Sequence, residues 1–175
     1  MRILIALFVI SINLVAQEYK TVIDEKYNEP MLIGVVDKAQ LDSPDFSYWF
    51  EPEYEEYEVD TMELKQIDGL LDDKEITIVM GTWCGDSHRE VPRFFKILKY
   101  LGVSSEYVKM IAVDRNKKGL NNEVEDLEIE LVPTFIFYSD QKEIGRIVES
   151  PIISLEADLV NILKKNTPAK PGQTK

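Results

Sequence analysis

The sequence predicts an α/β fold in which a central mixed β-sheet is flanked by helices. Two runs of apolar and largely β-branched residues, 75–80 and 109–114, are typical of buried strands. Between them, residues 89–101 place apolar side chains at helical spacing. Two further apolar stretches, 135–138 and 145–148, are close enough in the chain to pair as a hairpin.

The first residues, 1–16, resemble a secretory signal peptide. Arg2 gives a positive start, residues 3–15 are almost uninterruptedly apolar, and Ala16 is a small residue before the expected cleavage site. As a helix this apolar stretch would span about 20 Å, which is shorter than the roughly 30 Å core of a bilayer. We therefore expect an exported protein, periplasmic or secreted, without stable membrane insertion after cleavage.

Residues 17–65 are expected to form an N-terminal elaboration. Residues 31–36 are predicted to be a strand, and residues 46–58 interleave aromatic with acidic side chains. This aromatic and acidic region either packs its rings on the rest of the protein or serves as a partner-binding arm. We favour packing, because aromatic side chains at this density are usually buried. A helix is predicted for residues 61–71, with Thr61 as its N-cap.

Residues 66–166 are expected to form the main domain. After the strand at 109–114, a polar loop and a short acidic helix at 123–128 lead to Pro133, and residues 155–165 have the apolar spacing of a terminal helix. The tail, 167–175, is rich in proline and polar residues and is expected to be disordered.

The charge and cysteine content narrow the possible partners. The chain has 32 acidic and 20 basic residues, a net charge of −12, which argues against nucleic acid and anionic membrane surfaces. Its single cysteine, Cys84, excludes an internal disulfide, so this thiol is reactive, paired with another molecule, or buried. We expect no cofactor and no metal, and the sequence leaves the oligomeric state open.

Cys84 follows the strand at 75–80 and precedes the helix. Backbone N–H groups and the dipole at a helix start favour a thiolate there. Ser87, one turn further, is positioned in sequence to donate a hydroxyl hydrogen bond to the sulfur. His88, four residues after Cys84, is a candidate for tuning the ionisation of the thiol by adding positive charge, whereas Asp86 opposes it.

These residues carry a resemblance to a known family. The run Trp83-Cys84-Gly85-Asp86-Ser87 resembles the thioredoxin motif Trp-Cys-Gly-x-Cys, with serine in place of the second cysteine. Pro92 stands where thioredoxins carry a helix-kinking proline, and Val132-Pro133-Thr134 resembles their cis-proline loop. The resemblance covers residues 66–165 and implies a thioredoxin-like fold.

The resemblance also implies thiol–disulfide chemistry, with Cys84 and Ser87 as catalytic residues. Ser87 removes the resolving thiol, and Ile78 occupies the position where thioredoxins carry a buried acid. We therefore expect monothiol exchange through Cys84, in which an outside thiol or another cysteine of the substrate releases the product. Proteins or small molecules with thiols or disulfides would be the partners. The alternative is a redox-inactive binding module of the same fold in the cell envelope. The expected substrate groove, with a cis bond before Pro133, comprises Trp83, Gly85, Asp86, Val132, Pro133 and Thr134.

Overall fold

The computed structural model describes residues 18–166 of the 175. The predicted signal peptide, 1–16, and the predicted disordered tail, 167–175, lie outside the described residues. Within the described part, no helix has both the length and the apolar character that crossing a membrane requires.

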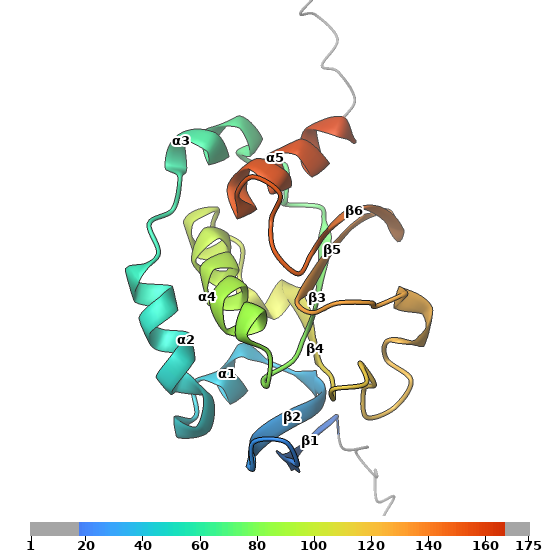
Figure 1. Ribbon diagram of the computed structural model, residues 1–175. Coiled ribbons are helices and arrows are strands. Elements are labelled where there is room, and N and C mark those ends of the chain that lie inside the picture. The colour runs from blue at the N-terminus through green and yellow to red at the C-terminus, as the bar shows by residue number, and fades with distance from the viewer. Residues whose placement is uncertain (1–17, 167–175) are drawn as a thin grey trace, which may run out of the picture.

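A six-stranded sheet runs through the described residues in the order β1-β2-β4-β3-β5-β6 (Figure 1). Its central strands β3 and β4 are parallel, and every other neighbouring pair is antiparallel. The sheet is therefore mixed, as the sequence predicts. The strands are β1 (Tyr19–Asp24), β2 (Glu29–Val36), β3 (Glu75–Met80), β4 (Val108–Ala112), β5 (Thr134–Ser139) and β6 (Lys142–Val148).

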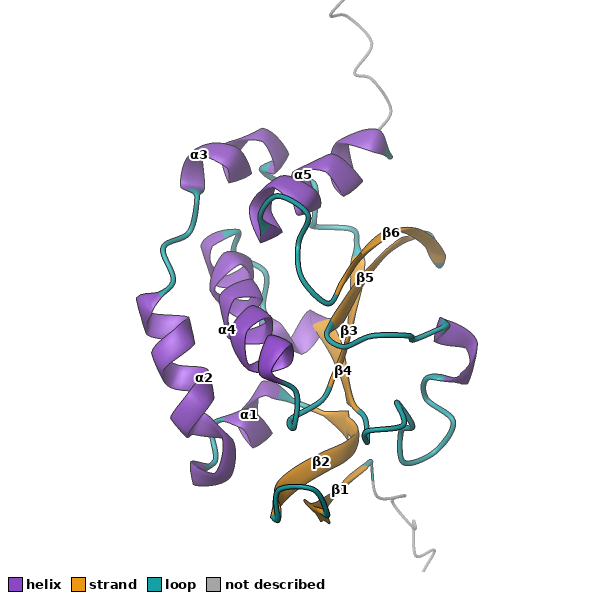
Figure 2. Ribbon diagram, in the orientation of Figure 1, coloured by secondary structure: helices purple, strands orange, loops and turns teal. Residues whose placement is uncertain are grey.

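The α-helices pack into one large apolar core on one face of the sheet, and Figure 2 shows α2 and α4 on the same side of the strands. They are α1 (Lys38–Leu41), α2 (Pro44–Glu56), α3 (Thr61–Leu64), α4 (Gly85–Tyr100) and α5 (Leu155–Lys165), with the 3₁₀ turns η1 (Lys65–Ile67), η2 (Ser105–Tyr107) and η3 (Glu125–Leu127). The opposite face is covered by the segment 114–131, which buries Val124 against Val79 and Ile111. The acidic helix predicted at 123–128 is thus only the single turn η3.

The position of β3 in the sheet explains why its sequence is almost continuously apolar. Ile76, Ile78 and Met80 face the large core, while Val79 faces the smaller cluster on the other side. A strand that is covered on both faces has no solvent-facing side on which polar residues would be favoured. Ile78 is fully buried in the large core.

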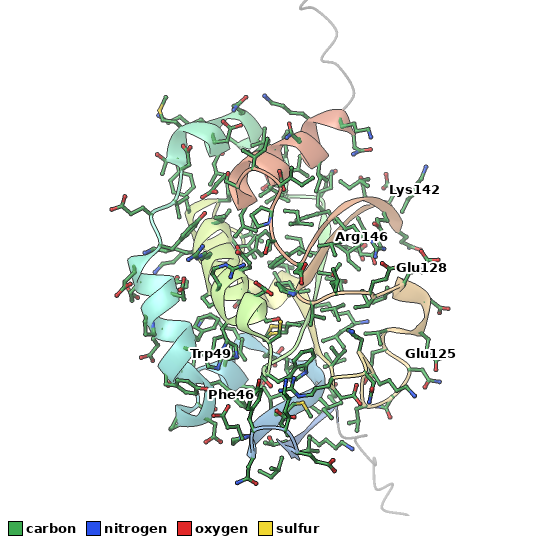
Figure 3. All side chains as sticks on the ribbon, viewed as in Figure 1. Phe46, Trp49, Glu125, Glu128, Lys142 and Arg146 are labelled. Carbon is green, nitrogen blue, oxygen red and sulfur yellow. The ribbon has the colours of Figure 1, made fainter. Side chains whose placement is uncertain are left out.

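The N-terminal elaboration packs its aromatic side chains into the same core. Phe46 and Trp49, labelled in Figure 3, and Phe50 are buried on α2, which packs against α4. Tyr48 on the same helix is 60% exposed. The packing interpretation is therefore confirmed for these three rings. Strand β1, which pairs with β2, was not predicted.

The helix predicted for 61–71 is shorter in the structure. Helix α3 ends at Leu64 and is followed by η1. Its N-cap is Asp60 rather than Thr61, because the Asp60 carboxylate accepts hydrogen bonds from the backbone N–H groups of Met62 and Glu63. The buried Glu156 of α5 accepts a further bond from the Asp60 N–H group, which fixes this turn against α5.

Candidate active site around Cys84

Cys84 is the N-cap residue of α4. Its backbone is extended, with φ −103° and ψ 123°. Its N–H group donates to the Gly81 carbonyl at 2.9 Å, and its carbonyl accepts from the N–H group of His88 at 3.0 Å. The half-buried sulfur therefore lies at the positive end of a 16-residue helix, where free N–H groups favour an anion.

The thiol faces the loop that precedes β5. Its Sγ donates to the Val132 carbonyl oxygen at 3.2 Å, and the Val132–Pro133 bond is cis. The structure thus brings Cys84 and this loop together, as the sequence analysis expects. A carbonyl acceptor favours the protonated thiol, whereas the start of a helix favours the thiolate. The two influences oppose each other until a substrate or a base displaces the contact with the carbonyl.

Thr134, which was expected to line the groove, lies within the sheet instead. It pairs with Val79 on one side and Val148 on the other, is 1% exposed, and donates its hydroxyl to the Leu131 carbonyl at 2.7 Å. Both its backbone and its side chain are therefore engaged inside the protein. Gly85, by contrast, is exposed beside the sulfur.

Ser87 is fully buried, and its hydroxyl has a different partner from the one expected. The Oγ accepts a hydrogen bond from the Gly81 N–H group at 3.2 Å. Within the described residues no hydrogen bond joins the Ser87 and Cys84 side chains. Ser87 therefore holds the turn between β3 and α4 in place.

His88 connects α2 to this turn. Its Nε2 donates to the Thr82 carbonyl at 2.7 Å, and its ring stacks on Trp49 at 4.2 Å with an angle of 10° between the planes. Burial lowers the pKa of His88, partly offset by the Thr82 carbonyl and the charge of Glu29. The imidazole is therefore neutral near pH 7. This environment disfavours the positive charge that the sequence analysis expects His88 to add at Cys84.

The negative charge of Asp86 is balanced by Arg89 on the same helix, α4. Its carboxylate pairs with Arg89 at 2.7 Å, and the same guanidinium contacts Glu90 at 2.7 Å and the Ser150 hydroxyl at 2.9 Å. The contact with Ser150 fixes the first turn of α4 to the segment that follows β6. The N–H group of Glu149 in that segment donates to the Pro133 carbonyl at 2.7 Å.

Trp83 lies flat against the turn before Cys84. Its Nε1 donates to the Val113 carbonyl at 2.8 Å, and its ring passes so close to Gly81 that a Cβ there would lie 2.6 Å from the indole. Thr82, which is buried, accepts a hydrogen bond from the Leu32 N–H group at 3.1 Å. The turn is thus fixed to both β2 and the end of β4.

Arg115 is the residue that the sequence analysis missed. Its guanidinium lies 4.8 Å from the centre of the Trp83 ring and pairs with both carboxylate oxygens of Asp24 at 2.7 Å. Asp24 is far away in sequence, at the end of β1. One signal does exist in the sequence: Arg115 comes three residues after the end of β4, which is parallel to β3, and the carboxyl ends of parallel strands meet at one edge.

Comparison with known proteins supports the same architecture. No protein-family model matches the chain. Over 80 residues it is 38% identical to a thioredoxin-like protein of Acanthamoeba polyphaga mimivirus, a match that covers 45% of this chain and 55% of the viral protein. The chain thus spans about half the length of this curated relative. The fold is thioredoxin-like.

Solved structures resemble the chain at low sequence identity. An HIV epitope scaffold aligns with a TM-score of 0.52 and 10% identity, over 69% of this chain and 86% of the scaffold. The thioredoxin of Fasciola hepatica aligns with a TM-score of 0.39 and 19% identity, over 59% and 89%. Mitochondrial thioredoxin 3 of Saccharomyces cerevisiae aligns with a TM-score of 0.37 and 21% identity, over 58% and 89%.

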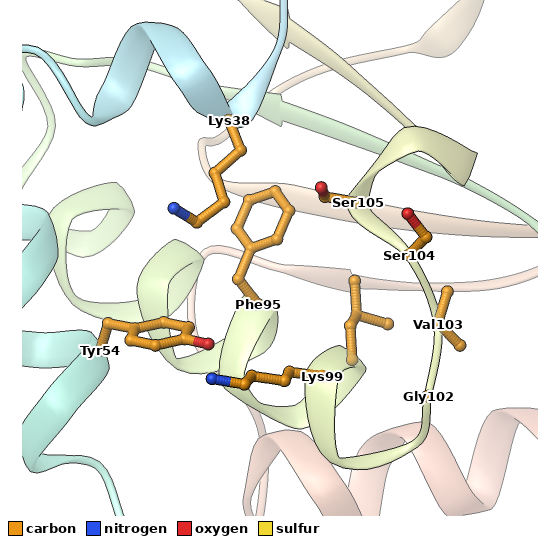
Figure 4. Close-up of a pocket in the computed structure, with 9 residues that line it drawn as sticks. Lys38, Tyr54, Phe95, Lys99, Gly102, Val103, Ser104 and Ser105 are labelled. Carbon is orange, nitrogen blue, oxygen red and sulfur yellow. The ribbon is translucent and has the colours of Figure 1, made fainter.

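Cys84 is half-buried, and two hollows in the surface of the described residues lie away from it. One of about 360 Å³ (Figure 4) is lined by Tyr54, Phe95 and Lys99. It adjoins the C-terminal half of α4, roughly 20 Å along the helix from Cys84. Another, of about 400 Å³, is lined by the segment 117–129. In residues 18–166, no group of three or more His, Cys, Asp or Glu residues is arranged to hold a metal ion.

Proposed function

We propose that this protein is exported and performs monothiol thiol–disulfide exchange through Cys84. The observation that carries the proposal is the position of Sγ, at the N-cap of α4 and 3.2 Å from the carbonyl of the cis-proline loop. The thioredoxin-like fold supports this chemistry. The export half of the proposal rests on the sequence of residues 1–16.

The reaction begins when the Cys84 thiol loses its proton to solvent. The thiolate attacks one sulfur of a substrate disulfide, forming a bond between Sγ and that sulfur while the other sulfur leaves as a thiolate. A second thiol, from outside or from the substrate itself, then attacks the mixed disulfide. Cys84 leaves as the thiolate and takes up a proton, and the attacking thiol is oxidised to a disulfide.

Ser87 and Ile78 limit this cycle to a monothiol route. Ser87 has no sulfur with which to attack the mixed disulfide, and its role is to hold the turn through the Gly81 N–H group. Ile78 is fully buried in the core and has no group that accepts a proton. The second step therefore depends on a thiol from another molecule or from the substrate.

A polypeptide partner fits the surroundings of the sulfur better than an enclosed small molecule. The two hollows described above are not lined by Cys84, whereas Leu131, next to the cis-proline loop, is 41% exposed. Ile152 and Ile153 are 94% and 72% exposed in the segment that the Arg89–Ser150 contact fixes near α4. Exposed apolar side chains of this kind favour binding of an extended peptide carrying the disulfide.

The test compares insulin reduction by the wild type, Ser87→Cys and Ser87→Ala. We expect little turnover by the wild type, with adducts on non-reducing gels that disappear on adding a thiol. Ser87→Cys should raise turnover, because intramolecular attack benefits from a high effective concentration. Ser87→Ala removes the bond to Gly81 without adding a thiol and should stay inactive. If the wild type forms no adducts and folded Cys84 resists alkylation, the exchange proposal fails and the binding module replaces it.

A further inference from the structure

The N-terminal hairpin, formed by β1 and β2, contacts Arg115, which in turn contacts the site. Asp24, at the end of β1, is 4% exposed and holds the guanidinium with two hydrogen bonds of 2.7 Å. The guanidinium also contacts two aromatic rings, 5.0 Å from the centre of the Tyr27 ring and 4.8 Å from the centre of the Trp83 ring. Four residues from three separate segments thus form one assembly: Asp24, Tyr27, Trp83 and Arg115.

This assembly fixes Arg115 more firmly than a surface ion pair would. A guanidinium bound through two parallel N–H···O bonds and in contact with two rings has few alternative orientations. Isolated ion pairs at a surface contribute little to stability, so stability alone is a weak reason for such an arrangement. What the assembly does for the site is to fix the position of the Trp83 ring. Trp83 directly precedes Cys84, and its indole lies between Arg115 and the Gly81 backbone.

The assembly also brings a positive charge near the sulfur. The guanidinium lies 4.8 Å from the centre of the Trp83 ring, and Trp83 directly precedes Cys84 in the chain. The pKa of Arg115 is raised, chiefly by its hydrogen bond to Asp24, so the group is charged at neutral pH. A positive charge near a cysteine sulfur favours the thiolate over the thiol.

The other titratable groups described above around Cys84 do not have this effect. On α4, Asp86 is neutralised by Arg89, and His88 has its cation disfavoured by burial. The cis-proline loop presents the Val132 carbonyl, which favours the thiol rather than the thiolate. On the hairpin, Asp24 is paired to Arg115 itself, and Tyr27 stacks on the same guanidinium.

We propose that Arg115 is a positioning residue for thiol–disulfide exchange, holding the Trp83 indole and placing a positive charge beside the attacking thiolate. This inference rests on the proposed function, and it gives the N-terminal hairpin, which lies outside the range of the thioredoxin resemblance, a direct part in the reaction. Asp24 and Tyr27 act through Arg115, and Arg115 acts through Trp83 and its charge.

The experiment measures the rate of Cys84 alkylation by iodoacetamide against pH in the full exported chain. Arg115→Met keeps an apolar stem beside Tyr27 and Trp83 but loses the charge. We expect its rate at neutral pH to fall about two- to fivefold and the midpoint of its pH profile to rise, with the same plateau at high pH. Arg115→Lys keeps the charge and should restore most of the wild-type midpoint.

The matched control is Arg146→Met. Arg146 pairs with Glu143 in the same two-pronged manner and is similarly exposed, but it lies on β6, toward the other end of the sheet from the hairpin (Figure 3). Its variant should keep the wild-type profile. Should Arg115→Met fail to fold, Arg115→Gln is measured in its place with the same expectation.

Two outcomes separate this inference from the proposed function. If wild-type Cys84 alkylates and folded Arg115→Met has the same pH midpoint, the role of Arg115 is refuted while exchange through Cys84 stands. If wild-type Cys84 does not alkylate in the folded protein, the proposed function itself fails. A midpoint shift in Arg146→Met equal to that of Arg115→Met would also refute the specific role of Arg115.

Discussion

Replacing Phe50 with alanine tests whether the N-terminal elaboration is part of the core. Phe50 lies on α2, is 1% exposed, and contacts three aromatic rings: Trp49 at 5.9 Å, Tyr54 at 5.9 Å and Phe95 at 6.0 Å between centroids. Lys38 also lies 4.8 Å above its ring. The substitution would remove these contacts and leave a cavity between α2 and α4.

The expected loss of unfolding free energy is about 4 kcal/mol. Truncating a buried phenylalanine to alanine costs about 3–5 kcal/mol, which already includes its aromatic contacts. The lost cation–π contact with the partly exposed Lys38 adds at most about 1 kcal/mol and keeps the estimate within that range. For a protein of this size, the midpoint of thermal unfolding should fall by roughly 10 °C.

Urea titration followed by circular dichroism measures the loss, and Tyr48→Ala is the control. Tyr48 lies on the same helix but is 60% exposed, so its replacement should change the unfolding free energy by less than about 0.5 kcal/mol. A loss below about 1 kcal/mol for Phe50→Ala would refute the packing of α2 and favour the partner-binding arm.

Two further substitutions test the geometry around Cys84. Because burial lowers the pKa of His88, the unfolded chain takes up this proton at a higher pH than the folded chain. The unfolding free energy of the wild type should therefore fall as the pH drops below about 6.5, and His88→Gln should lose this part of the pH dependence. Urea titrations at a series of pH values measure the dependence, and an unchanged slope in His88→Gln would contradict the prediction. Gly81→Ala would place a Cβ 2.6 Å from the Trp83 indole and should cost about 1–3 kcal/mol of unfolding free energy. Gly85→Ala is the control and should be nearly neutral, because its Cβ would have no atom within 4 Å. Equal losses of unfolding free energy in urea titrations of the two variants would count against the indole position.

The sequence predicted the elements that have a strong period or a continuous apolar run. Strand β3 and helix α5 have the predicted bounds, because both are defined by local patterns of apolar residues. Helix α2 was not predicted, since its aromatic residues are interleaved with glutamates and Pro52 interrupts the pattern. Strand β1 pairs only at the edge of the sheet and is half-exposed, so its sequence lacks a buried run.

The residues of the site, too, could be predicted only where neighbouring residues in the sequence form a motif. Cys84 and the cis-proline loop were found from motifs whose residues are adjacent in sequence. Arg115 was missed because its partner Asp24 is 91 residues away and the pairing depends on the sheet order. The environment of His88 could not be predicted either, because no local pattern specifies its stacking on Trp49 or the burial that lowers its pKa.

The most direct test of monothiol exchange follows the fate of a mixed disulfide on Cys84. Protein incubated with glutathione disulfide is freed of excess reagent, and its intact mass is followed with and without added thiol. We expect one glutathione per chain on Cys84 and none on Cys84→Ala. The adduct should persist without thiol and be released rapidly when thiol is added. Release without any thiol would contradict the monothiol route, and no adduct on the wild type would contradict exchange through Cys84 altogether.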